Sequence, residues 1–246
     1  MTELLCATDS YIRHFEARVV RVQPETGGVA LDRTAFFPGG GGQPCDVGRL
    51  VWEGGEAGVV RLNRADGEVW HILEGALPAE GAAVVGHLDW ERRYQLMRTH
   101  TALHILCGVV WRDYRAQVTG GNMEPLRGRL DFEFESLHHE MVQEIEERIN
   151  AEVGAAREVR VQTLPRDVAF QIPDLIRTKI NLLPPAITEV RTVEIVGLDL
   201  QADGGTHVAN TREVGHVRVV DYKSKGRINK RIEIALDPSL STSAEE

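Results

Sequence analysis

The feature that most constrains the fold of this chain is a change in the spacing of its hydrophobic residues at Asp89. Between residues 15 and 88, short runs rich in Val, Leu and Trp alternate with clusters of Gly, Pro and Asp. Such runs between turn residues predict β-strands. The predicted strands are EARVVRV, GVALDRT, GRLVWEG, GVVRLNR and EVWHILEG. We therefore predict a small β-barrel over residues 1–88.

After Asp89 the apolar residues recur at the spacing of a helix. Asp89 is suited to cap the start of that helix, because its carboxylate can accept hydrogen bonds from N–H groups of the first turn. The apolar positions that follow are Trp90, Tyr94, Met97, Leu103, Val109 and Val110. This pattern predicts a single long helix.

The rest of the chain predicts separate strands and helices. RLDFEFE alternates as a half-buried strand, and SLHHEMVQEIEERINAEVG repeats apolar residues as a helix capped by Ser136 and ended by Gly154. Four more strands are predicted from EVRVQTL, RTVEIVG, EVGHVRVVDY and GRINKRIEIAL, with the last two joined as a hairpin around SKGR. The predicted class is therefore α+β. We assign residues 89–240 to this second domain and residues 241–246 to a tail.

Composition excludes several classes of protein. No apolar run approaches the roughly 18 residues of a membrane span, and the N-terminus lacks the features of a signal peptide. We therefore expect a cytoplasmic protein without a membrane partner. The three cysteines are too few and scattered for a disulfide framework, and the net charge of −9 argues against general nucleic-acid affinity, so we expect no binding to DNA. We expect a monomer, because no oligomerisation domain follows the last predicted strand.

Two separate stretches carry residues that bind metal ions. In RTHTALHILC, His100 and His104 are four residues apart, so a helix presents both imidazoles on one face. Two such histidines are more often satisfied by hydrogen bonds than by a metal. In DLQADGGTHVANT, however, Asp203 and His207 bracket two glycines that allow a tight turn. The two stretches together offer four donors to one ion.

Two further stretches are candidates for contact with a nucleic acid. TAFFPGGGGQPCDVG contains four consecutive glycines and lacks the spacing of a nucleotide-binding loop, so it is either a loop that approaches an RNA end closely or a flexible turn. Its candidate contact residues are Gly40, Gly41, Gly42 and Gln43. The basic stretch YKSKGRINKR predicts phosphate contact through Lys225, Arg227 and Arg231, or else a solvated hairpin edge.

These stretches occur in one order that strongly resembles a known family. GGGGQPCDVG, RTHTALHIL, DLQADGGTHVANTREVG and KSKGRINKR match the alanyl-tRNA editing proteins, AlaX, which are similar to the detached editing domain of alanyl-tRNA synthetase. The resemblance covers nearly the whole chain and includes the glycine-rich N-terminal domain of the medium-length members. It implies a metal-dependent deacylase that hydrolyses the ester between a wrong amino acid, serine or sometimes glycine, and tRNA(Ala).

The resemblance also implies a Zn²⁺ ion held by His100, His104, His207 and the residue at position 203. The commoner pattern has cysteine at this position, whereas this chain has Asp203. A carboxylate binds zinc, but it is less selective than thiolate for zinc over manganese or iron. Asp203 is therefore either a ligand or the group that orients and deprotonates the attacking water.

The remaining catalytic assignments follow from the chemistry of an activated ester. The backbone N–H groups of Gly204 and Gly205 are candidate donors for the developing oxyanion. The resemblance places a polar side chain that senses the substrate near Thr119, and the alternative is a turn threonine. Two other functions remain open: a metal-dependent hydrolase of another small ester or amide, and a tRNA-binding module that has lost catalysis through Asp203.

Overall fold

The computed structural model describes residues 1–178, 183 and 187–238. The chain divides into two compact units, Met1–Tyr94 and Gln95–Glu246. The division falls within helix α1 (Trp90–Tyr114), which begins one residue after Asp89. The predicted tail, residues 241–246, lies outside the described residues. Within the described part of the chain, the helices are too short or too polar to cross a membrane.

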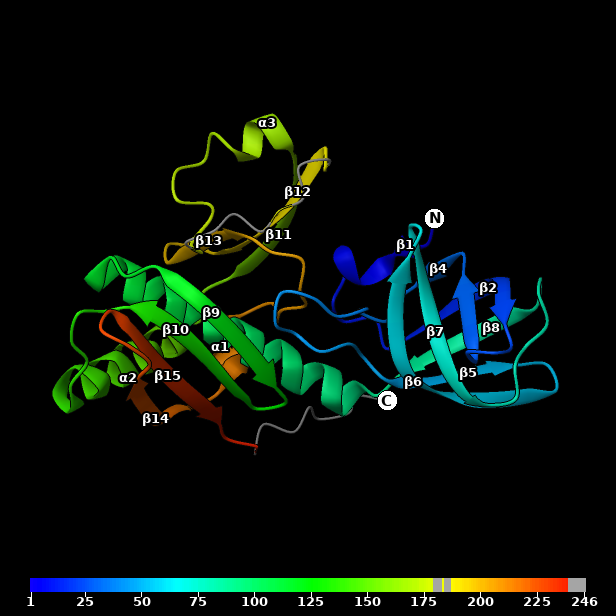
Figure 1. Cartoon of the computed structure of the whole chain (residues 1–246), viewed down its shortest axis with the longest axis horizontal. Helices are drawn as coiled ribbons and strands as arrows, with labels where there is room; N and C mark the ends of the chain where they lie inside the picture. The colour runs from blue at the N-terminus through cyan, green and yellow to red at the C-terminus, as the bar shows by residue number, and fades with distance from the viewer. Residues whose placement is uncertain (179–182, 184–186, 239–246) are drawn as a thin grey trace. The chain divides into compact units, whose positions relative to one another are not determined.

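The first unit is built around a closed six-stranded barrel, which confirms the predicted barrel (Figure 1). The strand order is β2 (His14–Gln23), β3 (Gly28–Leu31), β7 (Glu68–Gly75), β6 (Gly55–Ala65), β5 (Gly48–Trp52) and β8 (Ala83–Leu88), and β8 pairs with β2. The short strand β1 (Glu3–Leu4) pairs in parallel with β4 (Arg33–Thr34), and the 3-10 turn η1 (Leu5–Ala7) follows β1.

The barrel closes because alternate side chains of its strands point inward. Phe15 and Val19 of β2, Leu50 of β5 and Val84 of β8 are buried together in one hydrophobic core. The chain leaves β8 directly into α1. The carboxylate of Asp89 accepts a hydrogen bond from the backbone N–H of Arg92 at 3.1 Å, as the capping prediction requires.

The second unit contains two antiparallel sheets and the larger part of α1, which confirms the α+β class (Figure 1). The four-stranded sheet has the order β14 (Val217–Ser224), β15 (Asn229–Leu236), β10 (Arg127–Glu133) and β9 (Val118–Glu124). The three-stranded sheet has the order β11 (Val159–Pro165), β12 (Glu189–Ile195) and β13 (Asp199–Ala202). The other helical segments are α2 (His139–Gly154), α3 (Arg166–Ala169) and the 3-10 turn η2 (Thr211–Val214).

Helix α1 is buried on every side over residues 96–110. This explains why its apolar residues follow only part of the helical period, since a fully buried helix has no polar face. Two of its buried polar side chains, Arg98 and Thr99, are held by backbone carbonyls. The guanidinium of Arg98, for example, donates to the carbonyls of Val214 and Asp237 at 3.0 and 2.7 Å. A rigid, buried helix therefore carries His100 and His104.

Three local predictions were wrong or incomplete. Helix α2 is capped by His138 and not by Ser136: His138 is extended, and its Nδ1 accepts the N–H of Met141 at 3.4 Å. The strand predicted from EVGHVRVVDY begins only at Val217, because residues 211–214 form η2 behind a capping box at Asn210. Strands β9 and β13 were not predicted. Both are short and poor in the apolar residues that mark a strand.

Candidate metal centre

Helix α1 and the turn after β13 bring the four predicted donors together. His100 and His104 come from α1, and Asp203 and His207 follow β13. Each residue offers one ligand atom, and these atoms all lie within 4.8 Å of one another. The three histidines are buried, and the rings of His100 and His207 are stacked with centroids 4.2 Å apart. We refer to these four residues as the His/Asp cluster.

Strand β12 fixes the position of Asp203. The backbone N–H of Asp203 donates to the carbonyl of Arg191 at 3.0 Å, and the Arg191 guanidinium donates back to the carbonyl of Asp203 at 3.0 Å. The chain then turns at the two glycines, and the N–H of Gly205 donates to Asp203 Oδ2 at 2.7 Å. This geometry aims the carboxylate at His207, whose Nε2 lies 3.0 Å from the same oxygen.

Burial sets the protonation of the His/Asp cluster. It lowers the pKa of His207 to about 4 and holds the pKa of His100 well below its ordinary value. Burial opposes ionisation of Asp203, but the neighbouring imidazoles outweigh it and hold the pKa of this carboxyl well below its usual range. The neutral imidazoles of His100 and His207, beside an ionised carboxylate, are in the forms that bind a divalent metal ion.

Two further residues, which the sequence analysis missed, hold the histidine rings. Asp199 of β13 is buried, and its Oδ2 lies 3.2 Å from Nδ1 of His104. The hydroxyl of Thr101 lies 3.1 Å from Nδ1 of His207. Each contact occupies Nδ1 and leaves Nε2 as the ligand atom, an arrangement that commonly surrounds metal-bound histidines. Burial lowers the pKa of His104, but the hydrogen bond to Asp199 and the negative charges of Asp203 and Asp199 together outweigh burial and raise this pKa overall.

One sequence signal could have indicated Asp199. Asp199 and Gln201 are two residues apart in DLQAD, so a strand places them on the same face. In the structure, the Gln201 amide donates to Asp199 Oδ2 at 2.7 Å, and the guanidinium of Arg177 lies 3.5 Å from Oδ1. The missing step was the recognition of β13 as a strand.

The structure places the other predicted catalytic residues at different degrees of exposure. Gly204 is exposed, with open space beside its Cα. Gly205 is buried, and its N–H donates to the carboxylate of Asp203. Thr119 is exposed on β9, and its hydroxyl donates to Asn229 at 3.0 Å. Cys107 is buried, and burial raises the pKa of its thiol, as expected of a packing residue.

The glycine-rich stretch forms a tight turn in the first unit. Gly40 and Gln43 exchange backbone hydrogen bonds of 3.0 Å in both directions. Gly41 and Gly42 lie between them with φ angles of 60° and 92°, a conformation that glycine adopts at little cost. Gly40 and Gly41 are exposed, whereas Gln43 is buried. The turn therefore presents backbone without side chains at its tip.

The basic hairpin of β14 and β15 contains both exposed and internally paired cations. Lys225 and Arg227 are exposed at its turn. Arg231 forms two hydrogen bonds with the carboxylate of Asp131, at 2.7 and 2.9 Å, so its charge is largely neutralised within the sheet. Of the three predicted contact residues, Lys225 and Arg227 are therefore better placed than Arg231 to meet a phosphate.

Two family models match parts of the chain, one in each unit. Residues 190–233 match the threonyl and alanyl tRNA synthetase second additional domain, and residues 7–92 match the tRNA synthetases class II (A). The alanyl-tRNA editing protein AlaX-M of Saccharolobus solfataricus is 41% identical over 244 residues, which cover 97% of this chain and 100% of that protein. The chain belongs to the AlaX-M family.

Other relatives agree with this assignment. AlaX-M of Methanosarcina mazei is 37% identical over 244 residues, which cover 96% of this chain and 97% of the relative. The alanine–tRNA ligase of Pyrobaculum neutrophilum is 39% identical over 229 residues, or 89% of this chain but only 25% of the ligase. The chain is thus similar to an AlaX-M protein over its whole length and to one segment of a ligase, which confirms the resemblance found in the sequence.

Proposed function

We propose that this AlaX-M protein is a trans-editing aminoacyl-tRNA hydrolase that removes serine from mischarged tRNA(Ala), with glycine as a second candidate substrate. Alanyl-tRNA editing is the activity named in its full-length relatives. The observation that carries the proposal is the buried His/Asp cluster, with its four donor atoms within 4.8 Å of one another. Hydrolysis of an activated ester needs a positioned water and a polarised carbonyl, and it needs no nucleophilic side chain.

The His/Asp cluster fits one zinc ion. Ligand bonds of about 2.0 to 2.1 Å in a tetrahedron separate the ligand atoms by about 3.3 Å. Asp203 Oδ2 is 3.0 Å from Nε2 of His207, and Asp203 Oδ1 is 3.6 Å from Nε2 of His100. These separations support Asp203 as a ligand rather than as a base that only orients water. A bound zinc ion would supply a Lewis acid that polarises the ester carbonyl and lowers the pKa of a water.

The chain's own residues would then orient the substrate. We assign the exposed backbone of Gly204 as a donor to the developing oxyanion, with Gly205 acting indirectly by fixing Asp203. We assign Thr119 as the residue that senses the serine hydroxyl, since it is exposed on β9 and its hydroxyl oxygen can still accept a hydrogen bond while it donates to Asn229. A site that hydrogen-bonds a substrate hydroxyl can reject the analogue lacking it by up to about 10⁴- to 10⁵-fold.

Contact with the tRNA is assigned to the two exposed turns. Lys225 and Arg227 supply positive charge for backbone phosphates. Arg231 is a weaker candidate for such a contact, because it is paired with Asp131. The backbone of Gly40, Gly41 and Gly42, next to Gln43, allows a close approach of an RNA end. We assign residues 1–88 to the barrel domain and residues 89–240 to the metal-binding editing domain. We also propose that the protein is monomeric and acts in the cytoplasm.

A deacylation assay with three substrates tests the proposal. The protein is incubated with Ser-tRNA(Ala), Gly-tRNA(Ala) and Ala-tRNA(Ala), both as purified with its metal content measured and after chelation. We expect hydrolysis of Ser-tRNA(Ala), sparing of Ala-tRNA(Ala), and loss of activity on chelation that added zinc restores. Equal hydrolysis of a small seryl ester without tRNA would instead indicate a general metal-dependent esterase. Binding of tRNA without hydrolysis would indicate a module that has lost catalysis.

A further inference from the structure

The glycine-rich turn is the tip of a longer loop that is closed at its base. The backbone N–H of Asp46 donates to the carbonyl of Phe37 at 2.9 Å, and the N–H of Phe37 donates to the Asp46 carboxylate at 2.6 Å. Gly40 and Gln43 form a second hydrogen-bonded backbone pair, nearer the tip of the loop. Loop 37–46 is therefore a small hairpin whose tip has little steric restraint of its own, since nothing lies within 4 Å of a Cβ built at Gly40 or Gly41.

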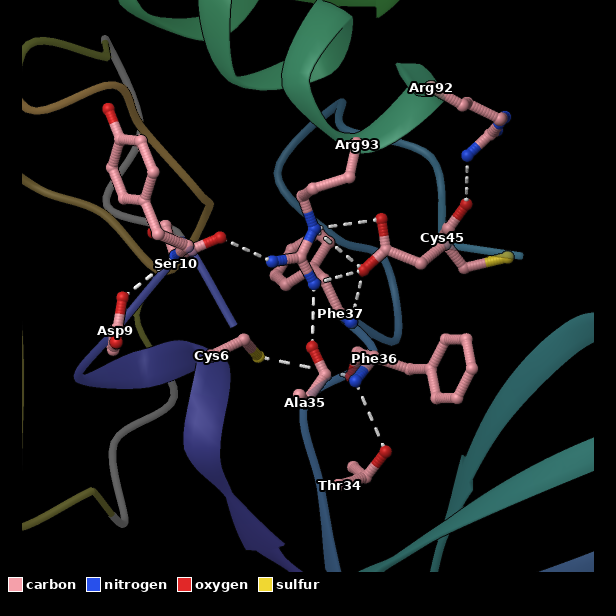
Figure 2. A network of polar contacts seen from close by, with 12 residues as sticks. Cys6, Asp9, Ser10, Thr34, Ala35, Phe36, Phe37, Cys45, Arg92 and Arg93 are labelled. Atoms are coloured by element: carbon pink, nitrogen blue, oxygen red, sulfur yellow. Dashed lines mark hydrogen bonds and ion pairs between the residues drawn. The ribbon is translucent and has the colours of Figure 1, made fainter. Parts of the chain in front are cut away.

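A single arginine side chain holds the base of loop 37–46. Arg93, in the first turn of α1, is fully buried, and Asp46 is only 1% exposed. The Arg93 guanidinium donates to both carboxylate oxygens of Asp46, with Nε at 3.0 and 2.9 Å, and Nη2 also contacts Oδ2. Figure 2 shows the same guanidinium directed to the carbonyls of Ser10 and Ala35, which accept at 2.9 and 2.6 Å.

The Arg93–Asp46 pair thus joins four segments that are distant in sequence. These are the turn after η1, the end of β4, the base of loop 37–46 and the first turn of α1. The neighbouring Arg92 adds one bond, from its Nη1 to the carbonyl of Cys45 at 2.8 Å (Figure 2). Asp46 and Cys45 belong to loop 37–46, and Ala35 follows β4 just before the loop. The network therefore restrains the base of the loop.

We propose that Arg93 and Asp46 are positioning residues for the glycine tip, and that they hold Gly40, Gly41 and Gly42 in the conformation in which their backbone contacts the tRNA. A glycine tip contributes no side chain that could guide a ligand, so its binding geometry depends on how its base is fixed. An arginine side chain is suited to fixing the base of the loop. The N–H groups of its planar guanidinium point outward in several directions, so it can hold a carboxylate and two carbonyls at once. This inference rests on the proposed function of the loop in tRNA contact.

The Asp46→Asn variant of the full chain tests the inference by two measurements. Asparagine keeps the shape of the side chain but removes the charge, and its amide group opposes the guanidinium. We expect the backbone amides of residues 39–43 to exchange with deuterium at least about tenfold faster, while the KM for Ser-tRNA(Ala) rises about 10- to 100-fold and kcat and metal content stay within about twofold. The matched control is Glu56→Gln, which breaks the exposed Arg49–Glu56 pair of the same barrel and should change none of these quantities.

A second substitution shows whether the pair acts through the tip. Gly41→Ala strains a residue with φ of 60° in open space, so it alters the tip without a steric clash. If Asp46 acts by positioning the tip, the Asp46→Asn/Gly41→Ala double variant should raise the KM little more than either single variant. Additive effects of the two substitutions, or loop amides that exchange as in the unmodified protein, would overturn the inference. A fall in kcat with an unchanged KM would overturn it as well.

A milder variant, and a measurement that does not depend on activity, complete the test. If Asp46→Asn yields no folded protein, Arg92→Ala removes a single bond at the loop base and should give a smaller change of the same kind, with KM raised and kcat preserved. If the unmodified protein hydrolyses none of the three aminoacyl-tRNAs, the proposed function fails, and the exchange measurement still decides whether the pair orders the loop.

Discussion

Each unit buries a histidine whose pKa is lowered to about 4, but the two rings have different partners. In the barrel, His71 lies between the carbonyl of Val29, 3.0 Å from Nδ1, and the hydroxyl of Thr34, 2.8 Å from Nε2. In the second unit, Nδ1 of His207 meets the hydroxyl of Thr101, whereas Nε2 faces the carboxylate of Asp203 and two more imidazoles. Burial has the same effect on both rings.

The difference between these histidines lies in where the second ring nitrogen points. His71 has one donor and one acceptor for its two nitrogens, so its site is complete as a neutral imidazole. The His/Asp cluster instead brings three imidazoles and an ionised carboxylate to one place, which is a donor set that a divalent cation binds. A lowered histidine pKa alone therefore does not identify a functional site, and the surrounding donors and acceptors do.

The largest expected effect comes from breaking the His/Asp cluster at Asp203. Asp203→Ala removes the only charged donor of the cluster, so metal should be lost and hydrolysis of Ser-tRNA(Ala) should fall by about 10³-fold or more. Asp203→Cys should retain zinc and activity, because thiolate is a zinc ligand. Metal content is measured on protein purified without added metal. Unchanged metal content in Asp203→Ala, with hydrolysis still reduced, would assign Asp203 to water orientation instead.

The stability of the folded protein should depend on pH through His71 of the barrel. Because folded His71 gains a proton only near pH 4, and the unfolded chain gains it near 6.5, the unfolded state binds more protons between these values. His71 should therefore contribute about 3 kcal/mol of stability above pH 6.5 that is lost as the pH falls toward 4. Titration of the ring by NMR checks this. A midpoint near 6.5 in the folded protein would show that the ring is not held neutral.

A smaller effect is expected when the partner of a ligand histidine is changed. Asp199→Asn keeps the size of the side chain but removes the negative charge beside His104, so metal affinity should fall about 10- to 100-fold. Competition with a chelator of known affinity measures the change. Asp113→Asn is the matched control, because this carboxylate pairs with the exposed side chains of Arg112 and Arg148, away from the His/Asp cluster residues. Equal metal affinities in Asp199→Asn and the unmodified protein would remove Asp199 from the site.

The smallest effect concerns the cations of the β14–β15 hairpin, where the same distinction between internally paired and exposed groups applies. Replacing Lys225 and Arg227 by Gln should flatten the log–log salt dependence of tRNA binding by about one unit for each lost phosphate contact. Lys223→Gln should change it less, since Lys223 already pairs with Asp221 and Glu233 at 2.9 and 3.1 Å. An unchanged slope in the double variant would show that the hairpin edge is only solvated.

The sequence predicted the features that depend on local pattern. The barrel strands, α1 with its Asp89 cap and the two donor pairs each lie within one short stretch, where hydrophobic spacing or residue interval is informative. The contacts across long intervals were not predictable in this way. Asp199 lies 95 residues from His104, and Arg93 lies 47 residues from Asp46, so only the folded chain shows that they meet. The His138 cap was missed for another reason: Ser is the more usual cap and stands two residues earlier.

The donor set of the His/Asp cluster also has a consequence for oxidative damage. Thiolates are the ligands that peroxides attack first, and their oxidation releases the metal they hold. Three imidazoles and a carboxylate contain no sulfur, and two of the three cysteines of the chain, Cys6 and Cys107, are buried. With aspartate at position 203, the site should therefore tolerate peroxide concentrations that would inactivate an otherwise identical site with cysteine there.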